Sequence, residues 1–339
     1  MTTADPRAAA AALLEGALAI LPTETVYGLA GRADRPESVA RIYAVKGRPS
    51  AHPVIVHVAD PSLDTESAGA WVRDVPDYAR ALAQSCWPGP LTLVLPRSSR
   101  ATDDVTGGQD TVAVRVPAHP EALAVLRAMD EIDPDGAPHG LAAPSANAFG
   151  HVSPTTLEHA LADLADRLAP GDVAIDGGPC MVGVESTIID CTGPQPRVLR
   201  PGRIGAADIQ RVTGLAVLDA ISSGIRVPGA LPSHYAPRAS IAIAPDAEAL
   251  EAYVDSAVIG GSEPSAIGVI APAAIPSPDD TVRLLEPDSA DSYARGLYDA
   301  LRRADAIGIT FIVAVLPPAD THGVSEAIAD RLRRASAPR

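Results

Sequence analysis

Short apolar runs and longer helical runs alternate along the first two hundred residues of this 339-residue chain. This alternation favours an α/β layer architecture, in which strands bury their faces against helices. Helices are expected over 6–17, 36–46, 75–85, 120–129, 154–168 and 205–213. Strands are expected over 18–22, 53–58, 91–96, 111–117, 172–176, 186–191 and 196–200. The pattern predicts one α/β domain over residues 1–213.

The alternation stops after about residue 213. Residues 214–239 are rich in proline and glycine, which prevent regular structure, and we interpret this stretch as an interdomain linker. The alternation then returns, with strands expected over 240–244, 266–271, 281–285 and 307–315 and helices over 246–258, 289–304 and 323–335. The pattern predicts a second, smaller α/β domain over residues 240–339.

Composition excludes several classes of protein. Hydrophobic residues make up 47% of the chain but aromatic residues only 3%, so the core must be aliphatic. No run approaches the roughly 20 apolar residues of a membrane span, and residues 1–6 lack the basic region of a signal peptide. We therefore expect a cytoplasmic protein that makes no membrane contact. The three cysteines show neither CxxC spacing nor an even count, so neither a disulfide framework nor a zinc site is predicted.

The charge of the chain is strongly negative, with a formal net charge of −15. The excess is shared: residues 1–239 hold 19 basic and 27 acidic residues, and residues 240–339 hold 8 and 15. Binding to a nucleic-acid backbone needs clustered cations, so a broad nucleic-acid surface is not expected. A local basic pocket remains compatible with this balance.

One lysine, Lys46, stands against 26 arginines. It lies in the run Lys46-Gly47-Arg48-Pro49, shortly after residues 22–28 (PTETVYG). An ammonium group is a compact point charge that fits between phosphate oxygens, whereas guanidinium is a flat fork. The position therefore suggests a phosphate contact, and a chance remnant of compositional drift is the alternative.

Polar residues interrupt two of the predicted strands. The two-residue period places Thr111, Ala113 and Arg115 on one face of the strand and the valines between them on the other. An arginine on that face indicates an anion, unless it simply faces solvent. His57 closes the apolar strand 53–58, where a binding role competes with that of a satisfied core or edge histidine.

Small residues gather at two further places. Ser153-Pro154-Thr155 opens a predicted helix with a serine N-cap; helix N-termini attract anions, although capping alone also explains Ser153. Residues 176–179 and 183–187 form glycine-rich turns that let backbone approach a ligand. The chain has no GxxxxGK[ST], GxSxG or HExxH motif, and no GxGxxG that opens a helix after a strand. Any nucleotide chemistry must therefore use a different phosphate site.

Eight short motifs, in order along the chain, together resemble the YrdC-like family of L-threonylcarbamoyladenylate synthases. They are residues 22–28 (PTETVYG), 46–49 (KGRP), 86–92 (CWPGPLT), 114–117 (VRVP), 143–147 (APSAN), 153–155 (SPT), 185–187 (EST) and 199–202 (LRPG). The linker run 233–237 (SHYAP) and the C-terminal region resemble the long, two-domain form. The resemblance implies a twisted mixed sheet flanked by helices around a deep cavity, with a smaller, Rossmann-like α/β domain after it.

The resemblance also implies a reaction. L-threonine, bicarbonate and ATP would give threonylcarbamoyl-AMP and pyrophosphate, with Mg²⁺ expected beside ATP. A downstream transferase would then pass the threonylcarbamoyl group to adenosine 37 of tRNA, and binding of tRNA by this acidic chain itself is expected to be weak or absent. The rival interpretations are a nucleic-acid-binding module and a carbamoyl transferase of the hydrogenase-maturation type, whose zinc-finger and acylphosphatase-like segments are absent from this sequence.

Site residues follow from the resemblance position by position. The implied L-threonine pocket consists of Thr25, His57, Arg115, Ala143 and Ser186, with Arg115 pairing the substrate carboxylate. The implied ATP contacts are Arg48, His52, Thr111, Ser145, Ser153, Arg200 and Tyr235, and Lys46 and Arg48 are the expected catalytic cations. His52 stands near a position where relatives commonly have asparagine. Tyr235 lies in the linker, so we expect the linker to act as a lid over the nucleotide.

Overall fold

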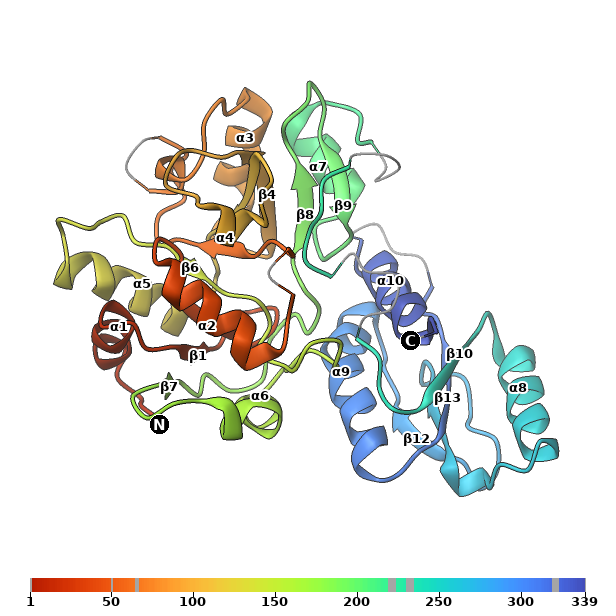
Figure 1. The fold of residues 1–339 in the computed structure, drawn as a ribbon. Helices are drawn as coiled ribbons and strands as arrows, with labels where there is room; N and C mark the ends of the chain where they lie inside the picture. Colours follow the sequence, from red (N-terminus) through yellow and green to blue (C-terminus); the bar gives the residue numbers. More distant parts are fainter. Residues whose placement is uncertain are drawn as a thin grey trace.

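Two separate β-sheets, each flanked by helices, organise the chain (Figure 1). The computed structural model describes residues 2–49, 51–64, 67–218, 224–229, 235–318 and 323–338. The larger sheet belongs to the N-terminal domain and the smaller one to the C-terminal domain. The expected α/β fold class, a mixed sheet followed by a smaller α/β domain, is confirmed.

The N-terminal sheet is mixed and has the strand order β7-β1-β2-β6-β3-β5-β4-β8-β9. Its strands are β1 (Ala19–Leu21), β2 (Gly28–Arg32), β3 (Ile55–His57), β4 (Leu91–Pro96), β5 (Thr111–Arg115), β6 (Leu141–Ala142), β7 (Val173–Ala174), β8 (Thr187–Asp190) and β9 (Arg197–Arg200). The pairs β1/β7, β3/β5 and β4/β8 are parallel, and the other neighbouring pairs are antiparallel. Strands β3 and β5 therefore bring their carboxyl ends together near the middle of the sheet.

Helices cover the two faces of this sheet unequally. They are α1 (Pro6–Leu14), α2 (Pro36–Lys46), α3 (Asp77–Cys86), α4 (Asp103–Thr106), α5 (Pro120–Ile132), α6 (Leu157–Leu164) and α7 (Ala206–Thr213). Apolar side chains of α2, α3, α6 and α7 pack on one face in a large aliphatic cluster. On the opposite face α1 and α5 cover one end of the sheet, and linker residues Ile225 and Val227 cover the other. Between these two covered ends, the middle of this second face borders a cavity.

The C-terminal domain has three layers. Its parallel sheet has the order β10-β13-β11-β12, formed by β10 (Ser240–Ala244), β11 (Ile267–Ile270), β12 (Val282–Leu285) and β13 (Phe311–Val315). Helix α8 (Ala247–Ile259) packs on one face, and α9 (Ala290–Ala306) and α10 (Val324–Ser336) pack on the other. Both helices of the second face lie between this sheet and the N-terminal domain (Figure 1).

The interface between the domains is a continuous apolar core. Val26, Val152 and Val184 of the N-terminal domain belong to the same buried cluster as Leu297 of α9. Gly183, at φ +80°, lies against the backbone of α9, where an added Cβ would stand 2.4 Å from the carbonyl oxygen of Ala294. At this contact the two domains therefore pack as closely as elements within one domain.

Most predicted elements occur within a few residues of their expected limits, and α2 has the limits that were expected. Strand β2 and the short helix α4 were not predicted. Ser233 and His234 of the linker motif lie outside the described residues. Among the described residues, no helix combines the length and the apolar character needed to cross a membrane.

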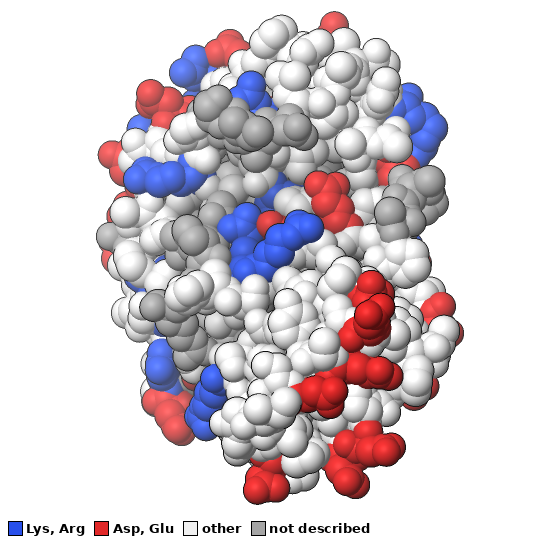
Figure 2. Space-filling view, turned by 90° about the vertical axis from the view of Figure 1, so that its right-hand side faces the viewer, with Lys and Arg blue, Asp and Glu red and all other residues white. Residues whose placement is uncertain are grey.

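Surface charge differs between the two halves of the molecule. Figure 2 shows the side that carries α8, where acidic side chains gather over the C-terminal domain and basic ones lie nearer the middle. Asp246, Glu248, Glu251 and Asp255 of the α8 region are all exposed. This part of the surface is therefore unsuited to a nucleic-acid backbone.

Candidate active site

A single cavity brings together most of the expected site residues. It encloses about 780 Å³ of space not filled by atoms, on the sheet face between α5 and the linker. Its lining residues are Thr23, Thr25, Val26, Gly28, Lys46, Arg48, His52, Ile55, His57, Arg115, Ala143, Pro144, Ser145, Asn147, Phe149, Gly150, Glu185, Arg200, Pro228, Gly229 and Tyr235. Arg115 and Lys46 thus face the same space from different elements.

The carboxyl ends of two parallel strands form one end of the cavity. His57 ends β3 and Arg115 ends β5, and the two residues are register partners. Ile55, two residues before His57, also lines the cavity, as the two-residue period requires. The strand geometry therefore aims an arginine and a histidine into the same place.

Arg115 is buried and fixed by three contacts. Its Nη2 lies 2.7 Å from Oε1 of Glu24, its Nη1 donates to Thr25 Oγ1 at 3.0 Å, and its Nε donates to the carbonyl of Gly89 at 3.2 Å. Glu24 is held in turn by the backbone N–H of Ala118, at 3.0 Å from Oε2. These contacts fix the guanidinium, whose remaining N–H groups can bind a further carboxylate.

His57 is an uncharged imidazole. Burial and the nearby guanidinium of Arg115 lower the pKa of His57 to about 3. At neutral pH the ring therefore adds no positive charge and can accept or donate a hydrogen bond.

Lys46 lies at the C-terminal end of α2, where Gly47 ends the helix in the left-handed conformation (φ 64°). The ammonium group donates to the carbonyl of Asn147 at 2.6 Å and to the carbonyl of Ser145. Burial and the charge of Arg48 lower the pKa of Lys46 well below its usual 10.5, while the carboxylate of Asp163 opposes them. An anion placed beside this amine would stabilise its charged form.

Two arginines add positive charge on the same side as Lys46. Arg48 donates to the carbonyl of Pro53 at 2.8 Å, and Arg200 donates to the carbonyls of Ser186 at 2.9 Å and Pro228 at 2.9 Å. Burial lowers the pKa of both guanidinium groups, but guanidinium keeps its proton in proteins. The cavity therefore carries three cations from α2, the loop after it and β9.

An aromatic pair borders the same region. The rings of His52 and Phe149 lie 5.8 Å apart at 52°. Burial and the charges of Arg48 and Arg226 lower the pKa of His52. A neutral imidazole beside a phenyl ring offers a surface on which a flat, apolar group can stack.

The C-terminal domain supports one wall of the cavity. Glu185 lines the cavity and accepts hydrogen bonds from Arg331 Nε of α10 at 2.8 Å, from the hydroxyl of Tyr298 of α9 at 2.8 Å, and from Ser153 at 2.6 Å. Burial alone would raise the pKa of Glu185, but Arg331, Arg200 and Ser153 lower it to about 2. Tyr235 stacks on Tyr298 with ring centroids 5.6 Å apart. The linker residue is thus held between the two domains.

Ten of the thirteen expected site residues line the cavity, and three do not. Ser186 is fully buried behind it and shares hydrogen bonds with Thr92 and Arg200. Ser153 is fully buried and donates to Glu185. Thr111 lies at the opposite end of β5 from Arg115, four residues or about 13 Å along the strand. Direct substrate contact by these three residues stays a prediction.

Sequence reasoning missed three contributors to the site. Glu24 and Glu185 were noted only as members of motifs, although both are buried acids paired with buried arginines. Asn147 is buried, lines the cavity, and ties the loop that holds Lys46 by donating to the carbonyls of Ala148 at 2.8 Å and His151 at 2.9 Å. Neither glutamate stands in an apolar run, since Thr23 and Thr25 flank Glu24 and Ser186 follows Glu185, so no local pattern marks them.

The described residues contain no group of three or more histidine, cysteine, aspartate or glutamate side chains that could hold a metal ion. A divalent cation in this cavity would therefore need oxygen atoms from its ligand. The side-chain oxygen of Asn147 is buried without a hydrogen-bond partner among the described residues and is one protein oxygen that fits such an ion.

Two sequence profiles match almost the whole chain. Residues 11–202 match the Sua5–YciO–YrdC profile, whose description is "Telomere recombination", and residues 204–337 match a profile described as "Threonylcarbamoyl-AMP synthase, C-terminal domain". Together with the mixed sheet and its cationic cavity, they define a two-domain α/β protein with a site for anionic ligands. The chain belongs to the Sua5–YciO–YrdC family, in its two-domain form.

Similar proteins are alike over nearly their full length. The chain is 39% identical to the threonylcarbamoyl-AMP synthase of Bacillus subtilis, over 100% of this chain and 95% of that protein. It is 36% identical to the protein of the same name from Pyrococcus abyssi, over 97% of this chain and 93% of that protein. The crystal structure of P. abyssi Sua5 complexed with L-threonine superposes with a TM-score of 0.84, covering 98% of this chain and 94% of that one.

Proposed function

We propose that this protein is an L-threonylcarbamoyladenylate synthase, a nucleotidyltransferase that uses L-threonine, bicarbonate and ATP to form threonylcarbamoyl-AMP and pyrophosphate. The observation that carries the proposal is one cavity that holds a fixed guanidinium, Arg115, and a separate cationic group around Lys46. The names of the full-length relatives and the L-threonine complex of the P. abyssi protein support it.

The Arg115 end of the cavity is the proposed amino-acid subsite. Arg115 pairs the carboxylate of L-threonine, and Thr25 and Ala143 border the amino acid. His57, being neutral, accepts or donates a hydrogen bond to a polar group of the substrate without attracting a second anion. Ser186, buried behind the wall and hydrogen-bonded to Thr92 and Arg200, completes the set that we assign to this end.

The Lys46 end is the proposed ATP subsite. Lys46, Arg48 and Arg200 hold the triphosphate, with Lys46 and Arg48 closest to the reacting phosphate. His52 and Phe149 flank the adenine, and Tyr235 closes the site from the linker. Ser145 lies beside Lys46, and Thr111 and Ser153 complete the set that we assign to this end.

The proposed chemistry needs no protein nucleophile. The threonine amine attacks the carbon of bicarbonate, a C–N bond forms as a C–O bond breaks, and water leaves to give a carbamate. A carbamate oxygen then attacks the α-phosphorus, and a new P–O bond forms as the bond to pyrophosphate breaks. The protein supplies alignment and charge neutralisation, and alignment alone can lower such a barrier by about 7 to 11 kcal/mol. The fixed contacts of Arg115 and Lys46 provide that alignment.

Mg²⁺ accompanies the triphosphate in this proposal. Asn147 is the residue that would hold the ion, through its buried side-chain oxygen, and the other ligands would come from the triphosphate and water. When bound, the ion neutralises charge on the phosphates.

The biological setting is also part of the proposal. The product passes to a downstream transferase that modifies adenosine 37 of tRNA, in the cytoplasm. Direct tRNA binding by this chain is weak or absent, in line with its net charge of −15 and its acidic C-terminal domain. Residues 1–213 act as the catalytic domain, 214–239 as the linker and lid, and 240–339 as the C-terminal domain.

The direct test is an omission assay. Purified protein is mixed with ATP, L-threonine, bicarbonate and Mg²⁺, each left out in turn, while pyrophosphate is measured. Formation of pyrophosphate only when ATP, threonine and bicarbonate are all present is expected. Pyrophosphate release that does not depend on threonine would contradict the proposal. A tRNA mobility shift at physiological salt tests the rival of a nucleic-acid-binding module.

The division into two subsites predicts separable losses. Arg115→Ala should abolish binding of L-threonine, because the carboxylate loses its only assigned cation, whereas binding of ATP should persist. Calorimetry with each ligand checks this, and the exposed Arg7→Ala serves as the control. Equal loss of both ligands would contradict the separate subsites.

A further inference from the structure

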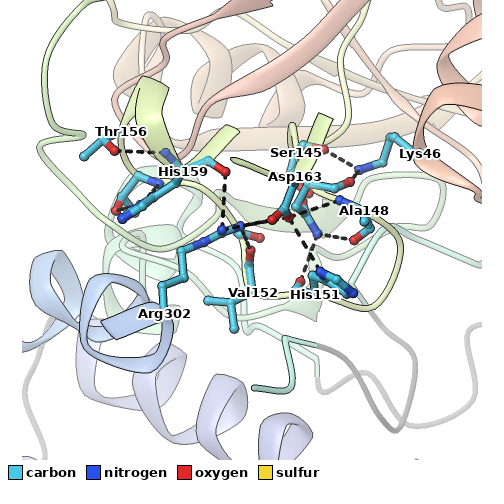
Figure 3. A network of polar contacts seen from close by, with 12 residues as sticks. Lys46, Ser145, Ala148, His151, Val152, Thr156, His159, Asp163 and Arg302 are labelled. Carbon is cyan, nitrogen blue, oxygen red and sulfur yellow. Dashed lines mark hydrogen bonds and ion pairs between the residues drawn. The ribbon is translucent and has the colours of Figure 1, made fainter. Parts of the chain in front are cut away.

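A chain of polar contacts joins the C-terminal domain to the carbonyl groups that hold Lys46 (Figure 3). It begins at Arg302 on α9, passes through Asp163 on α6, and reaches the loop of residues 145–152. The side chains of Arg302 and Asp163 are 14% and 11% exposed. Because most of the surface of both side chains is buried, water weakens this ion pair less than one on the open surface.

At one end, the loop holds Lys46 from two sides. The carbonyls of Ser145 and Asn147 accept from its ammonium group, and the backbone N–H of Phe149 donates to its carbonyl at 2.9 Å. The position of the ammonium group therefore follows the position of this loop.

At the centre, Asp163 links the loop to the other domain. Its Oδ2 accepts from the backbone N–H of Ala148 at 3.2 Å and from Arg302 Nη2 at 3.1 Å. Its Oδ1 accepts from Arg302 Nη1 at 3.2 Å, and His151 Nδ1 lies 3.8 Å from Oδ2. One carboxylate thus binds both the loop backbone and the guanidinium.

Arg302 also contacts the end of the loop directly. It donates to the carbonyl of Val152, and to the carbonyl of His159 on α6 at 3.3 Å. The guanidinium of a C-terminal helix therefore contacts the loop, α6 and the carboxylate between them (Figure 3).

The loop lies between two cavities. Asn147, Phe149 and Gly150 line the candidate active site, whereas Ala148 and His151 line a second space between the domains, of about 1100 Å³ and open to solvent, which Asp163 and Arg302 also line. Since space rather than packed side chains backs much of the loop on that side, polar contacts have a large share in fixing it.

We propose that Asp163 and Arg302 are positioning residues that fix the 145–152 loop. Through them, the position of the C-terminal domain against α6 and the loop sets the affinity for the triphosphate. This inference rests on the proposed function, because it needs Lys46 to bind the phosphates of ATP. Neither residue touches the substrate. Each acts through the loop, so the effect falls on the ATP end of the cavity and spares the Arg115 end.

The test compares steady-state kinetics of full-length variants. Arg302→Gln and Asp163→Asn should each raise KM for ATP about tenfold and leave KM for L-threonine within about twofold, a size typical of coupling through a contact network. Arg302→Lys, which keeps the charge, should recover part of the loss. The double variant should be no worse than the worse single variant, because the two residues act as one unit.

A matched control lies one residue further along α9. Arg303 donates to the carbonyls of Arg283 and Leu284 inside the C-terminal domain, so Arg303→Gln should leave KM for ATP unchanged. Asp163→Asn keeps an oxygen for the N–H of Ala148, but it removes the charge and turns the oxygen that faces Arg302 Nη1 into a donor. It therefore breaks the link to Arg302 at similar volume and decides the question if Arg302→Gln does not fold.

The outcomes separate this inference from the proposed function. An unchanged KM for ATP in Asp163→Asn, or an equal rise in KM for both substrates, would overturn the positioning role. If Lys46→Arg raises KM for ATP while Asp163→Asn does not, only the positioning role fails. If Lys46→Arg also leaves ATP binding unchanged, the ATP subsite itself is wrong.

Discussion

Replacing Arg331 with methionine would remove the cation that the C-terminal domain places beside Glu185. The two side chains are only 1% and 7% exposed, and Arg331 Nε lies 2.8 Å from the carboxylate. Methionine fills a similar volume but cannot neutralise the charge. Glu185 would then remain buried with only Ser153 and Tyr298 as hydrogen-bond donors among its assigned partners.

The size of the loss can be worked from the carboxylate. The pKa of Glu185 lies at about 2 in the folded protein against an ordinary 4.5. That difference corresponds to about 3 kcal/mol of net stabilisation of the charged form, in which Arg331, Arg200 and Ser153 together outweigh the cost of burial. Breaking a buried ion pair from one side typically costs about 3 to 5 kcal/mol, so the two magnitudes agree. Arg331→Met should therefore lower the free energy of unfolding by about 3 kcal/mol at pH 7.

Urea unfolding followed by circular dichroism measures this loss. Arg334→Met on the same helix is the control; its ion pair with Asp330 is 20% and 16% exposed, and its loss should cost about 1 kcal/mol or less. The double variant Glu185→Gln/Arg331→Met should recover part of the stability, since no buried charge is left unpaired.

The pH dependence supplies the refutation. Because the folded-state pKa of Glu185 is depressed, its stabilisation is fully present above pH 4.5 and is lost as pH falls towards 2. The difference between wild type and Arg331→Met should therefore shrink over that range. A difference below about 1 kcal/mol at pH 7, or one that does not change between pH 7 and pH 3, would refute the assigned ion pair.

Three further predictions concern the ATP end of the site. Lys46→Arg should lower kcat/KM roughly 100-fold although the charge is kept, because a planar guanidinium cannot occupy the space between two carbonyls and the phosphates. A fully active variant would mean that the single lysine is an accident of composition. Burial and Arg48 depress the pKa of Lys46, so at pH values between that depressed value and 10.5 the amine should take up a proton when ATP binds. Calorimetry in buffers of different ionisation enthalpy would show this as a binding heat that depends on the buffer. A heat independent of the buffer would contradict the prediction. Gly229 has φ +76°, and an added Cβ would lie 2.1 Å from the hydroxyl of Tyr235. Gly229→Ala should therefore lower the free energy of unfolding by about 1 to 3 kcal/mol and raise KM for ATP. A variant with wild-type stability and wild-type KM would refute this packing.

Much of the fold could be predicted from the sequence, because most elements carry a clear apolar period. Helix α2 and strand β10 have the limits that the pattern gives. Strand β2 does not, since Gly28 and Gly31 weaken its strand propensity and only pairing with β1 and β6 makes it a strand. Its existence depends on tertiary structure that a local window does not contain.

The site shows the same division. Lys46 and Arg115 were identifiable because an unusual cation, or a cation on an apolar strand, has few structural roles. The pair Glu185 and Arg331 was not, because its members are 146 residues apart and meet only when the domains dock. The carbonyl groups around Lys46 were equally hidden, since every residue has one and only the folded loop selects two.

The lone, buried Lys46 has a practical consequence for protein chemistry. Crosslinkers and labels that react with side-chain amines would find a single such target in this sequence, and that target is 3% exposed inside a cavity. Amine-directed crosslinking to a partner would thus report only contacts near the N-terminal α-amine and would miss a partner bound elsewhere. Carboxylate-directed reagents, with 42 acidic residues to address, suit this chain better, and slow acylation of Lys46 that ATP suppresses would report occupancy of the cavity.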